Sequence, residues 1–532
     1  MGARVVDRLV TRPGAVALVV VALASYGLQA VAWPLERGRD SWDYWLWFLQ
    51  AADGDPPFSA LQVFRTPVAP LVTGIPMWVG GAALTEVVLG ILYALSLLGW
   101  AWAVAPISRG AALATGVVLL LAAPYAGLFH EVSSDPVFAF VLAWWAGAVV
   151  RAWMTGTTAW LVTVGVGVAV LTLTRPAAQV ALLACVLVPL ISRRRWTPAL
   201  RSVAVCLAAA VVPLAVWAVH NAVRYDDLAV ARGSKAWVPF FRVAGDIDPA
   251  NGDASRRLAD AVQRRVLTLP PYASRDVDVQ RYFHGAGNLE VIRMIALSDS
   301  EFGWDSDYDV LFDASLEAIR KHPWGYVEGV SETFWDFLSQ HYAPEPRARP
   351  VPIPDLPAEI EVDGKPFPAP ITVSPLVPAI RYGLVWCPTD DLERCVVHDP
   401  VAALGDAGEA ARYEELIDTI RDWNAQLPTR DSNAWLASKG GTASDRWPRS
   451  FLWIAVAVVA LAIRRPRGSA PVLVLMAVGG LVLWVHALSQ APQSEFALPF
   501  VPVWIVAALV GLLAPRSADG AAPPDGDNDG RS

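Results

Sequence analysis

The chain has 532 residues, of which 55% are hydrophobic, and a formal net charge of -8 at pH 7. A chain with a modest negative charge and no basic stripe is not expected to bind nucleic acid. About ten apolar runs contain almost no ionisable residue, while acids, histidines and arginines crowd their ends. Because roughly 20 apolar residues span a bilayer, we expect a mainly α fold, a polytopic membrane bundle of about 10–11 spans.

The apolar runs occur, in chain order, near residues 14–35, 82–106, 110–128, 135–153, 157–174, 177–192, 200–221, 450–464, 470–488 and 493–514. The first run could instead be a signal peptide, since Ala30-Val31-Ala32 resembles a cleavage site, although its apolar core is long and further spans follow. Segment 66–81 is short and rich in proline, which favours an interfacial or re-entrant helix over a straight span.

Arginine placement predicts the orientation, because cytoplasmic loops retain positive charge during insertion. Arg4, Arg8 and Arg12 precede the first run, and further clusters lie at 193–195 and 464–467. We therefore expect a multi-pass protein with both termini in the cytoplasm. Only four of the 42 basic residues are lysine, which suggests a GC-rich bacterial genome and hence a bacterial inner (plasma) membrane.

Composition divides the chain into four predicted regions. Residues 1–221 form an N-terminal transmembrane module with a first external loop at 36–81. The polar segment 222–449 is expected to be a mixed extracytoplasmic domain inserted before the last three spans, 450–514 the C-terminal transmembrane helices, and 515–532 a disordered cytoplasmic tail. Outside the cytoplasm Cys387 and Cys395 can close a disulfide; a zinc site with His398 is the alternative.

The first external loop carries the strongest local signal, the run from Asp40 to Trp47. In a helix, Asp40, Asp43, Tyr44 and Trp47 share one face. Aromatic rings can stack on a sugar while a carboxylate takes a proton from an attacking hydroxyl, so this face suits a sugar. The alternative is a solvated helix start, with Asp40 beside the positive end of the helix dipole.

The pattern Asp40-Ser41-x-x-Tyr44, followed by Phe64-Arg65-Thr66-Pro67-x-x-Pro70-Leu71, resembles the first external loop of the GT-C superfamily of membrane glycosyltransferases, specifically family 39-like (protein mannosyltransferase-like) bacterial members. Val68-Ala69 stands where that family commonly has Gly-Tyr. Further matches, in the family's order and on one side of the membrane, are Ser134-Asp135, Thr174-Arg175-Pro176 and His220-Asn221.

The resemblance implies a transferase that moves a sugar from a polyprenyl-phosphate donor to an extracytoplasmic glycan, lipid or protein, with inversion. The sugar is left open between a hexose such as mannose and a pentose such as arabinofuranose. Asp40 matches the catalytic base and Asp135 the second acid, which orients the acceptor or binds a divalent cation (Mg²⁺ or Mn²⁺), an optional cofactor in the family. Arg175 and Arg65 match donor-phosphate ligands, since a guanidinium pairs bidentately with phosphate.

Five more residues are candidate substrate contacts: Asp43, Tyr44, Trp47, His130 and Glu131. Other interpretations remain open for some of the site. Asp135 could cap its helix, Arg175 could extend to the interface, and His130-Glu131 could meet lipid headgroups. A late group, His486, Gln490, Gln493 and Glu495, could close the site from the other side.

The rival function is an envelope lipid or polysaccharide transporter or flippase. Such carriers usually need ionisable groups near the bilayer midplane, and the sequence shows none clearly there.

Overall fold

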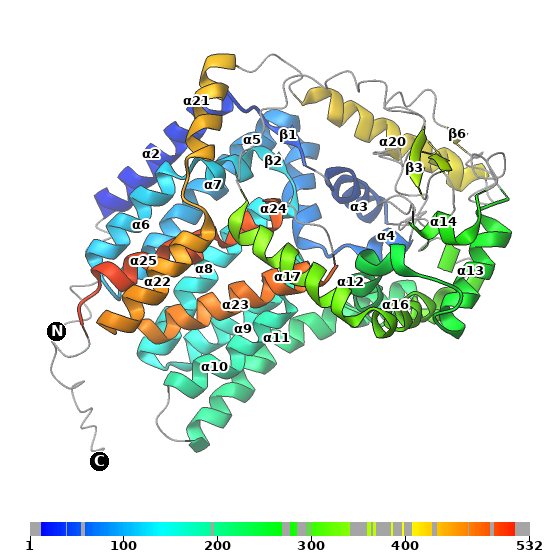
Figure 1. The fold of residues 1–532 in the computed structure, drawn as a ribbon. Coiled ribbons are helices and arrows are strands. Elements are labelled where there is room, and N and C mark those ends of the chain that lie inside the picture. Colours follow the sequence, from blue (N-terminus) through cyan, green and yellow to red (C-terminus); the bar gives the residue numbers. More distant parts are fainter. Residues whose placement is uncertain are drawn as a thin grey trace.

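The computed structural model describes residues 12–38, 40–54, 59–192, 196–268, 277–284, 294, 297–298, 301–340, 359–362, 365–368, 385–386, 396–397, 407–427, 433–466, 468–489 and 494–516. The described chain is mainly helical (Figure 1). Cys387, Cys395 and the tail from 517 lie outside the described residues, so the predicted disulfide and disordered tail stay predictions.

Each predicted apolar run coincides with helix. The helices are α2 (Arg12–Ala30), α5 (Val68–Val104), α6 (Arg109–Leu121), α7 (Ala123–Gly127), α8 (Ser134–Thr155), α9 (Thr158–Thr174), α10 (Leu182–Ser192), α11 (Trp196–Tyr225), α22 (Ser450–Arg464), α23 (Ser469–Ser489), α24 (Ser494–Ala497) and α25 (Val501–Leu513), with 3₁₀ turns η1 (Leu128–His130), η2 (Pro176–Ala181) and η6 (Leu498–Phe500).

Several of these helices are long and apolar enough to cross a membrane, which is consistent with the predicted multi-pass protein. Within the described residues five helices meet that test, or up to seven when two bent pairs each count as one span. Three further apolar helices are shorter, at Thr158–Thr174, Pro176–Ser192 and Leu498–Leu513. Within the described residues, the long helices, the bent pairs and the shorter helices together account for the ten predicted apolar runs.

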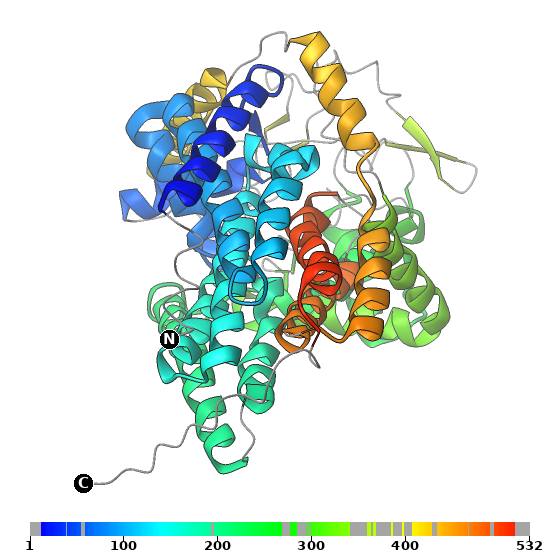
Figure 2. The same cartoon turned by 90° about the vertical axis from the view of Figure 1, so that its left-hand side faces the viewer.

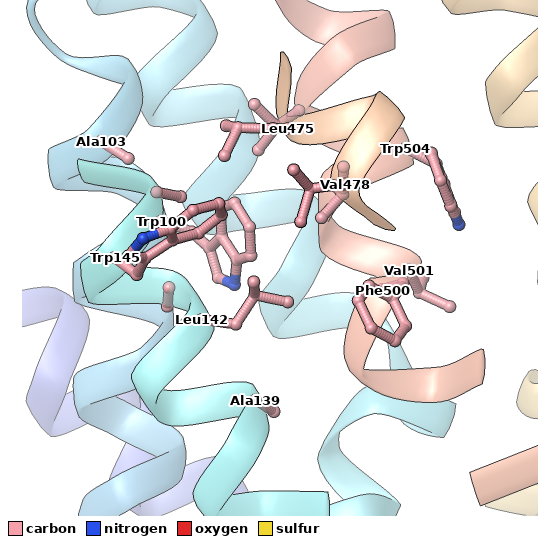
Figure 3. Packing of buried hydrophobic residues seen from close by; sticks show 14 of the residues in the cluster. Trp100, Ala103, Ala139, Leu142, Trp145, Leu475, Val478, Phe500, Val501 and Trp504 are labelled. Atoms are coloured by element: carbon pink, nitrogen blue, oxygen red, sulfur yellow. The ribbon is translucent and has the colours of Figure 1, made fainter. Parts of the chain in front are cut away.

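The first and last apolar helices share one hydrophobic core. The cluster that Figure 3 shows contains Trp100 of α5, Trp145 of α8, Leu475 of α23, Phe500 of η6 and Val501 of α25, and Tyr26 of α2 belongs to it as well. The outer faces are apolar as well: in α11, Val212, Val216 and Val219 are more than half exposed. Apolar groups on both faces suit a helix between protein and lipid.

Helix α5 is interrupted near its first third. Gly80 (φ -146°, ψ 16°) and Gly81 (φ 64°, ψ -158°) leave the helical region, and the positive φ of Gly81 is one that side chains other than glycine rarely adopt. A straight helix of 37 residues would measure about 55 Å, well beyond a core of about 30 Å. The break separates residues 68–79, the proline-rich piece predicted not to span, from the apolar stretch 82–104.

The described part of segment 222–449 is mostly helical, as its helical spacing of apolar residues predicts. It contains α12 (Ser234–Val243), η3 (Ala244–Asp246), α13 (Asp253–Arg265), α14 (Val279–His284), η4 (Trp304–Ser306), α16 (Asp309–Lys321), α17 (Pro323–Ser339), α20 (Ala407–Gln426) and α21 (Ala434–Asp445). Two antiparallel hairpins pair β3 (Glu359–Val362) with β4 (Lys365–Pro368) and β5 (Val385–Trp386) with β6 (Val396–Val397).

Helices α12, α13, α14 and α16 enclose a second core, around Phe240, Leu258, Tyr282 and Leu311, beside the membrane bundle (Figures 1 and 2). The loop predicted at 36–81 lies at the same end of the bundle. It contains β1 (Glu36–Arg37), the predicted helix α3 (Ser41–Asp53), the short helix α4 (Ser59–Phe64) and the first part of α5.

Candidate functional site

A short parallel strand pair brings the two predicted acidic segments together. β1 pairs with β2 (Glu131–Val132) in the register Glu36↔Glu131 and Arg37↔Val132. Asp40 follows Arg37 by the same number of residues as Asp135 follows Val132, and parallel strands leave the pair in the same direction. The chain at Gly38 runs so close to β2 that a Cβ there would be 2.5 Å from the Val132 carbonyl oxygen.

Arg65, directly after α4, binds both acids of the first loop. Its Nη1 donates to Asp40 Oδ2 at 3.2 Å, its Nε donates to Asp43 Oδ2 at 3.0 Å, and its Nη2 also donates to Asp43. The Asp43 side chain is 7% exposed and that of Asp40 is 34% exposed. Asp43 therefore anchors the arginine, and Asp40 is the acid that an incoming molecule can reach.

The surroundings hold Arg65 charged and Tyr44 neutral. Burial alone lowers the pKa of the Arg65 guanidinium, but Asp40 and Asp43 outweigh burial and raise it above its ordinary value. Burial raises the pKa of the Tyr44 phenol to about 12, even though the nearby Arg65 charge lowers it. Ser134 and the charge of Arg175 also lie near enough to the Tyr44 hydroxyl to lower its pKa, so Tyr44 lies between the first loop and the second acidic segment.

Asp135 and Arg175 form the second ion pair of the site. Ser133 caps α8 by accepting a hydrogen bond from Asp135 N at 3.2 Å, which leaves the Asp135 carboxylate for Arg175. Ser133, and not Asp135, is therefore the helix cap. The side chains of Asp135 and Arg175 are only 7% and 10% exposed, so Arg175 does not extend to an interface. Pro176 forces the break after α9 that places Arg175 at this helix end.

The start of α24 and the end of α23 close the second pair from the other side. The guanidinium of Arg175 lies 4.7 Å from the Phe496 ring centroid, and the His486 ring lies 4.7 Å from the same ring. His486 was among the late residues expected here. Gln490 and Gln493 lie outside the described residues, as does the side chain of Glu495. Phe496 was missed because an aromatic residue at a span end usually indicates only membrane anchoring.

Three predicted substrate contacts lie apart from the ion pairs. Trp47 is buried: its Nε1 donates to the Gln62 carbonyl at 3.2 Å and its carbonyl accepts from Gln62 Nε2 at 2.9 Å. His130 stacks on Tyr26 of α2 with ring centroids 4.1 Å apart, and its ring nitrogens have no hydrogen-bond partner among the described residues. Glu131 lies in β2 opposite Glu36.

A divalent cation has no ready site in the described part of the chain. No group of three or more histidine, cysteine or acidic side chains comes together there. Asp40, Asp43 and Asp135 each bind an arginine instead. These acids therefore do not fit the Mg²⁺ or Mn²⁺ that the resemblance allows, and no step of the chemistry below uses a metal.

Comparison of the chain with protein-family profiles, curated proteins and solved structures gave no match.

Proposed function

We propose that the chain is a membrane glycosyltransferase of the GT-C type, which moves a sugar from a polyprenyl-phosphate donor to an extracytoplasmic acceptor with inversion. One observation carries the proposal: two arginine–carboxylate clusters, Arg65 with Asp40 and Asp43 and Arg175 with Asp135, are brought together by the β1–β2 pair at one end of an apolar bundle. A donor with a lipid tail and a charged head needs both an apolar bundle and cations at its end.

The proposed chemistry assigns the proton to Asp40 and the phosphate to the arginines. The acceptor hydroxyl attacks the anomeric carbon from the side opposite the phosphate, a carbon–oxygen bond forms, and the bond from that carbon to the phosphate oxygen breaks. Asp40, the more exposed acid, takes the hydroxyl proton. The leaving polyprenyl phosphate gains negative charge, which Arg175 and Arg65 stabilise through charge-assisted hydrogen bonds.

Asp43 and Asp135 act on the arginines in this mechanism. A guanidinium has several donors in one plane, and a carboxylate that holds one edge fixes the direction of the others. Asp43 holds Arg65 by two hydrogen bonds, and Asp135 holds Arg175. Both arginines are thereby oriented before a donor arrives, which lowers the cost of ordering them in the transition state.

The rival transporter function predicts ionisable groups near the middle of the spans. The acids of the candidate site lie at helix starts instead: Asp135 is in the first turn of α8, and Asp43 is in the first turn of α3. Acids at one end of the bundle, rather than along its middle, suit transfer rather than transport.

The direct test incubates membranes containing the protein with labelled polyprenyl-phosphate hexoses and pentoses. We expect label in an acceptor from one donor class, the same amount with Asp253→Asn, an exposed acid of α13, and none without the protein. Unchanged donor that moves across sealed vesicles, with no glycosidic product, would instead establish the transporter.

Orientation is tested separately with an impermeant thiol reagent in intact cells, with the parent chain as background. Asp253 has a 92% exposed side chain, and Thr157 lies exposed in the turn between α8 and α9. We expect label at Asp253→Cys and none at Thr157→Cys. The reverse pattern would place the site in the cytoplasm and exclude an extracytoplasmic acceptor.

A further inference from the structure

Helix α17 carries bulky apolar side chains on two opposite sides. One side is buried against the bundle by Val330 and Phe337. On the other side Trp324, Val327 and Trp335 are 81%, 50% and 55% exposed. Two indole rings facing outward on one helix are unusual for a surface in contact with water and indicate an interaction surface.

Contacts with α22 and α23 fix where this helix lies. The Tyr326 hydroxyl donates to the Leu488 carbonyl in the last turn of α23 at 3.2 Å, and the Trp335 ring lies 5.5 Å from Phe451 in the first turn of α22. A short turn joins α22 to α23, so the start of α22 and the end of α23 are at the same end of the bundle. Helix α17 thus packs against α23 and α22 at this end of the two apolar helices (Figure 1).

The outward side of α17 is itself divided into two stripes. At 100° per residue, Trp324, Val327, Ser331 and Trp335 fall on one stripe, and Glu328 and Glu332 fall beside it on the same outward half. The apolar stripe is on the same edge of the helix as Phe334, whose ring lies 5.4 Å from Trp484 of α23. The acids lie on the edge away from these rings.

The apolar stripe of α17 is continuous with the apolar outer surface of the bundle. Trp335 contacts Phe451, and beyond it α22 exposes Leu452, Val456 and Val459. Aromatic rings gather at this level, as tryptophans do where a membrane protein meets lipid headgroups. An amphipathic helix in that layer places its apolar stripe among acyl chains and its charged stripe in water.

We propose that α17 is an interfacial anchor whose Trp324–Val327–Trp335 stripe inserts into the headgroup layer of the bilayer. Phospholipid is the occupant of this surface. The anchor fixes the height of the second core above the membrane, because Arg242 of α12 donates to Thr333 of α17 at 2.7 Å. The assignment depends only on the bundle being in a membrane and is independent of the proposed transferase activity.

The experiment uses the purified full-length protein in phosphatidylcholine–phosphatidylglycerol liposomes that contain a phospholipid with a diazirine near its headgroup. After illumination, mass spectrometry locates the lipid adducts. We expect adducts on α17 at Trp324, Val327 and Trp335, severalfold above those on α16 (Asp309–Lys321), a helix of similar length in the same region of the chain. Adducts on α17 no more frequent than on α16 would overturn the proposal.

Two variants and one further probe separate lipid from other occupants. The double variant Trp324→Ser, Trp335→Ser should lose the adduct at Val327, whereas Glu328→Ser should keep it. Hydroxyl-radical oxidation of the same liposomes should spare Trp324 and Trp335. Rings that are oxidised freely would place the stripe in water, and rings protected from both probes would place it against protein; either result contradicts the anchor.

Discussion

Arg65 and Arg232 both form ion pairs with acids, yet their surroundings differ. The side chains of Arg232 and its partner Asp227 are 2% and 5% exposed, whereas those of Arg65 and Asp40 are 21% and 34% exposed. Arg232 also donates to the Tyr308 hydroxyl at 3.1 Å and the Trp304 carbonyl at 2.6 Å, and lies 3.6 Å from the Trp304 ring centroid. Such a saturated cation holds structure together, whereas the Arg65 cluster keeps an acid within reach of a substrate.

The Arg232 cluster supports the position of the Arg65 cluster. The backbone N–H of Arg232 donates to the Val63 carbonyl at 2.8 Å, two residues before Arg65. Asp307 and Tyr308, on the other side of Arg232, have φ of 41° and 62°, a strained backbone that persists only where neighbours hold it. Burying a charge costs free energy unless it is paired and hydrogen-bonded, and Arg232 has the Asp227 carboxylate, the Tyr308 hydroxyl and the Trp304 carbonyl as partners.

The largest expected effect on activity distinguishes Asp40 from Asp43, the two acids that bind Arg65. Asp40→Asn cannot accept a proton at neutral pH, and loss of a general base typically lowers the rate by a factor of about 100 to 10,000. Asp43→Asn keeps an acceptor oxygen for Arg65 and should cost much less. The measurement is sugar transfer per mole of folded protein. Normal turnover in Asp40→Asn together with loss of turnover in Asp43→Asn would assign the catalytic base to Asp43, one helical turn away.

The next effect tests whether Arg232 is structural. Arg232→Met leaves Asp227 buried without its partner, which should lower the free energy of unfolding by about 3–5 kcal/mol. The control is Lys235→Met, whose side chain is 49% exposed beside the 60% exposed Asp309, where an ion pair contributes about 1 kcal/mol or less. Thermal unfolding in detergent compares them, and equal losses would show that the Arg232 pair is no more than a surface contact.

The sequence predicts those features that depend on local composition. Apolar runs predict the helices, and the acid and aromatic spacing predicts α3 with Asp43 and Tyr44 on one face. The pairing of distant segments could not be predicted: β1 and β2 have only two residues each, and nothing in the sequence indicates that Arg65 binds both Asp40 and Asp43. Arg232 was missed because its partners Trp304 and Tyr308 come more than 70 residues later, in a polar segment that resembles a solvated surface.

A smaller effect tests the strand pair that aligns Asp40 with Asp135. In Gly38→Ala the new Cβ meets the Val132 carbonyl and must push β1 from β2, at an expected cost of about 1–3 kcal/mol in stability. Transfer should fall as well, because the two clusters separate. Gly27→Ala in α2, where a Cβ meets nothing within 4 Å, is the control. Full activity in Gly38→Ala would mean that the clusters do not act together.

The smallest expected effect concerns an acid that binds backbone rather than arginine, Glu317 of α16. It accepts hydrogen bonds from Ala254 N at 3.1 Å and Ser255 N at 2.8 Å, at the start of α13. Burial alone raises the pKa of the Glu317 carboxyl, but these backbone donors outweigh it and lower the pKa below its ordinary value. Glu317→Gln should therefore lower the free energy of unfolding by about 1 kcal/mol at neutral pH, as loss of a helix cap does.

The lowered pKa of Glu317 also predicts how the stability difference between parent and Glu317→Gln changes with pH. Because the pKa of Glu317 is lower in the folded than in the unfolded state, its contribution is complete above the unfolded value of about 4.3 and is lost as the pH falls through the folded value. The stability difference between parent and Glu317→Gln should therefore be constant near neutrality and shrink below about pH 4. Asp313→Asn, an exposed acid on the same helix, is the control. A parent–variant difference in unfolding free energy that grows on acidification would show that Glu317 stabilises α13 in its protonated form.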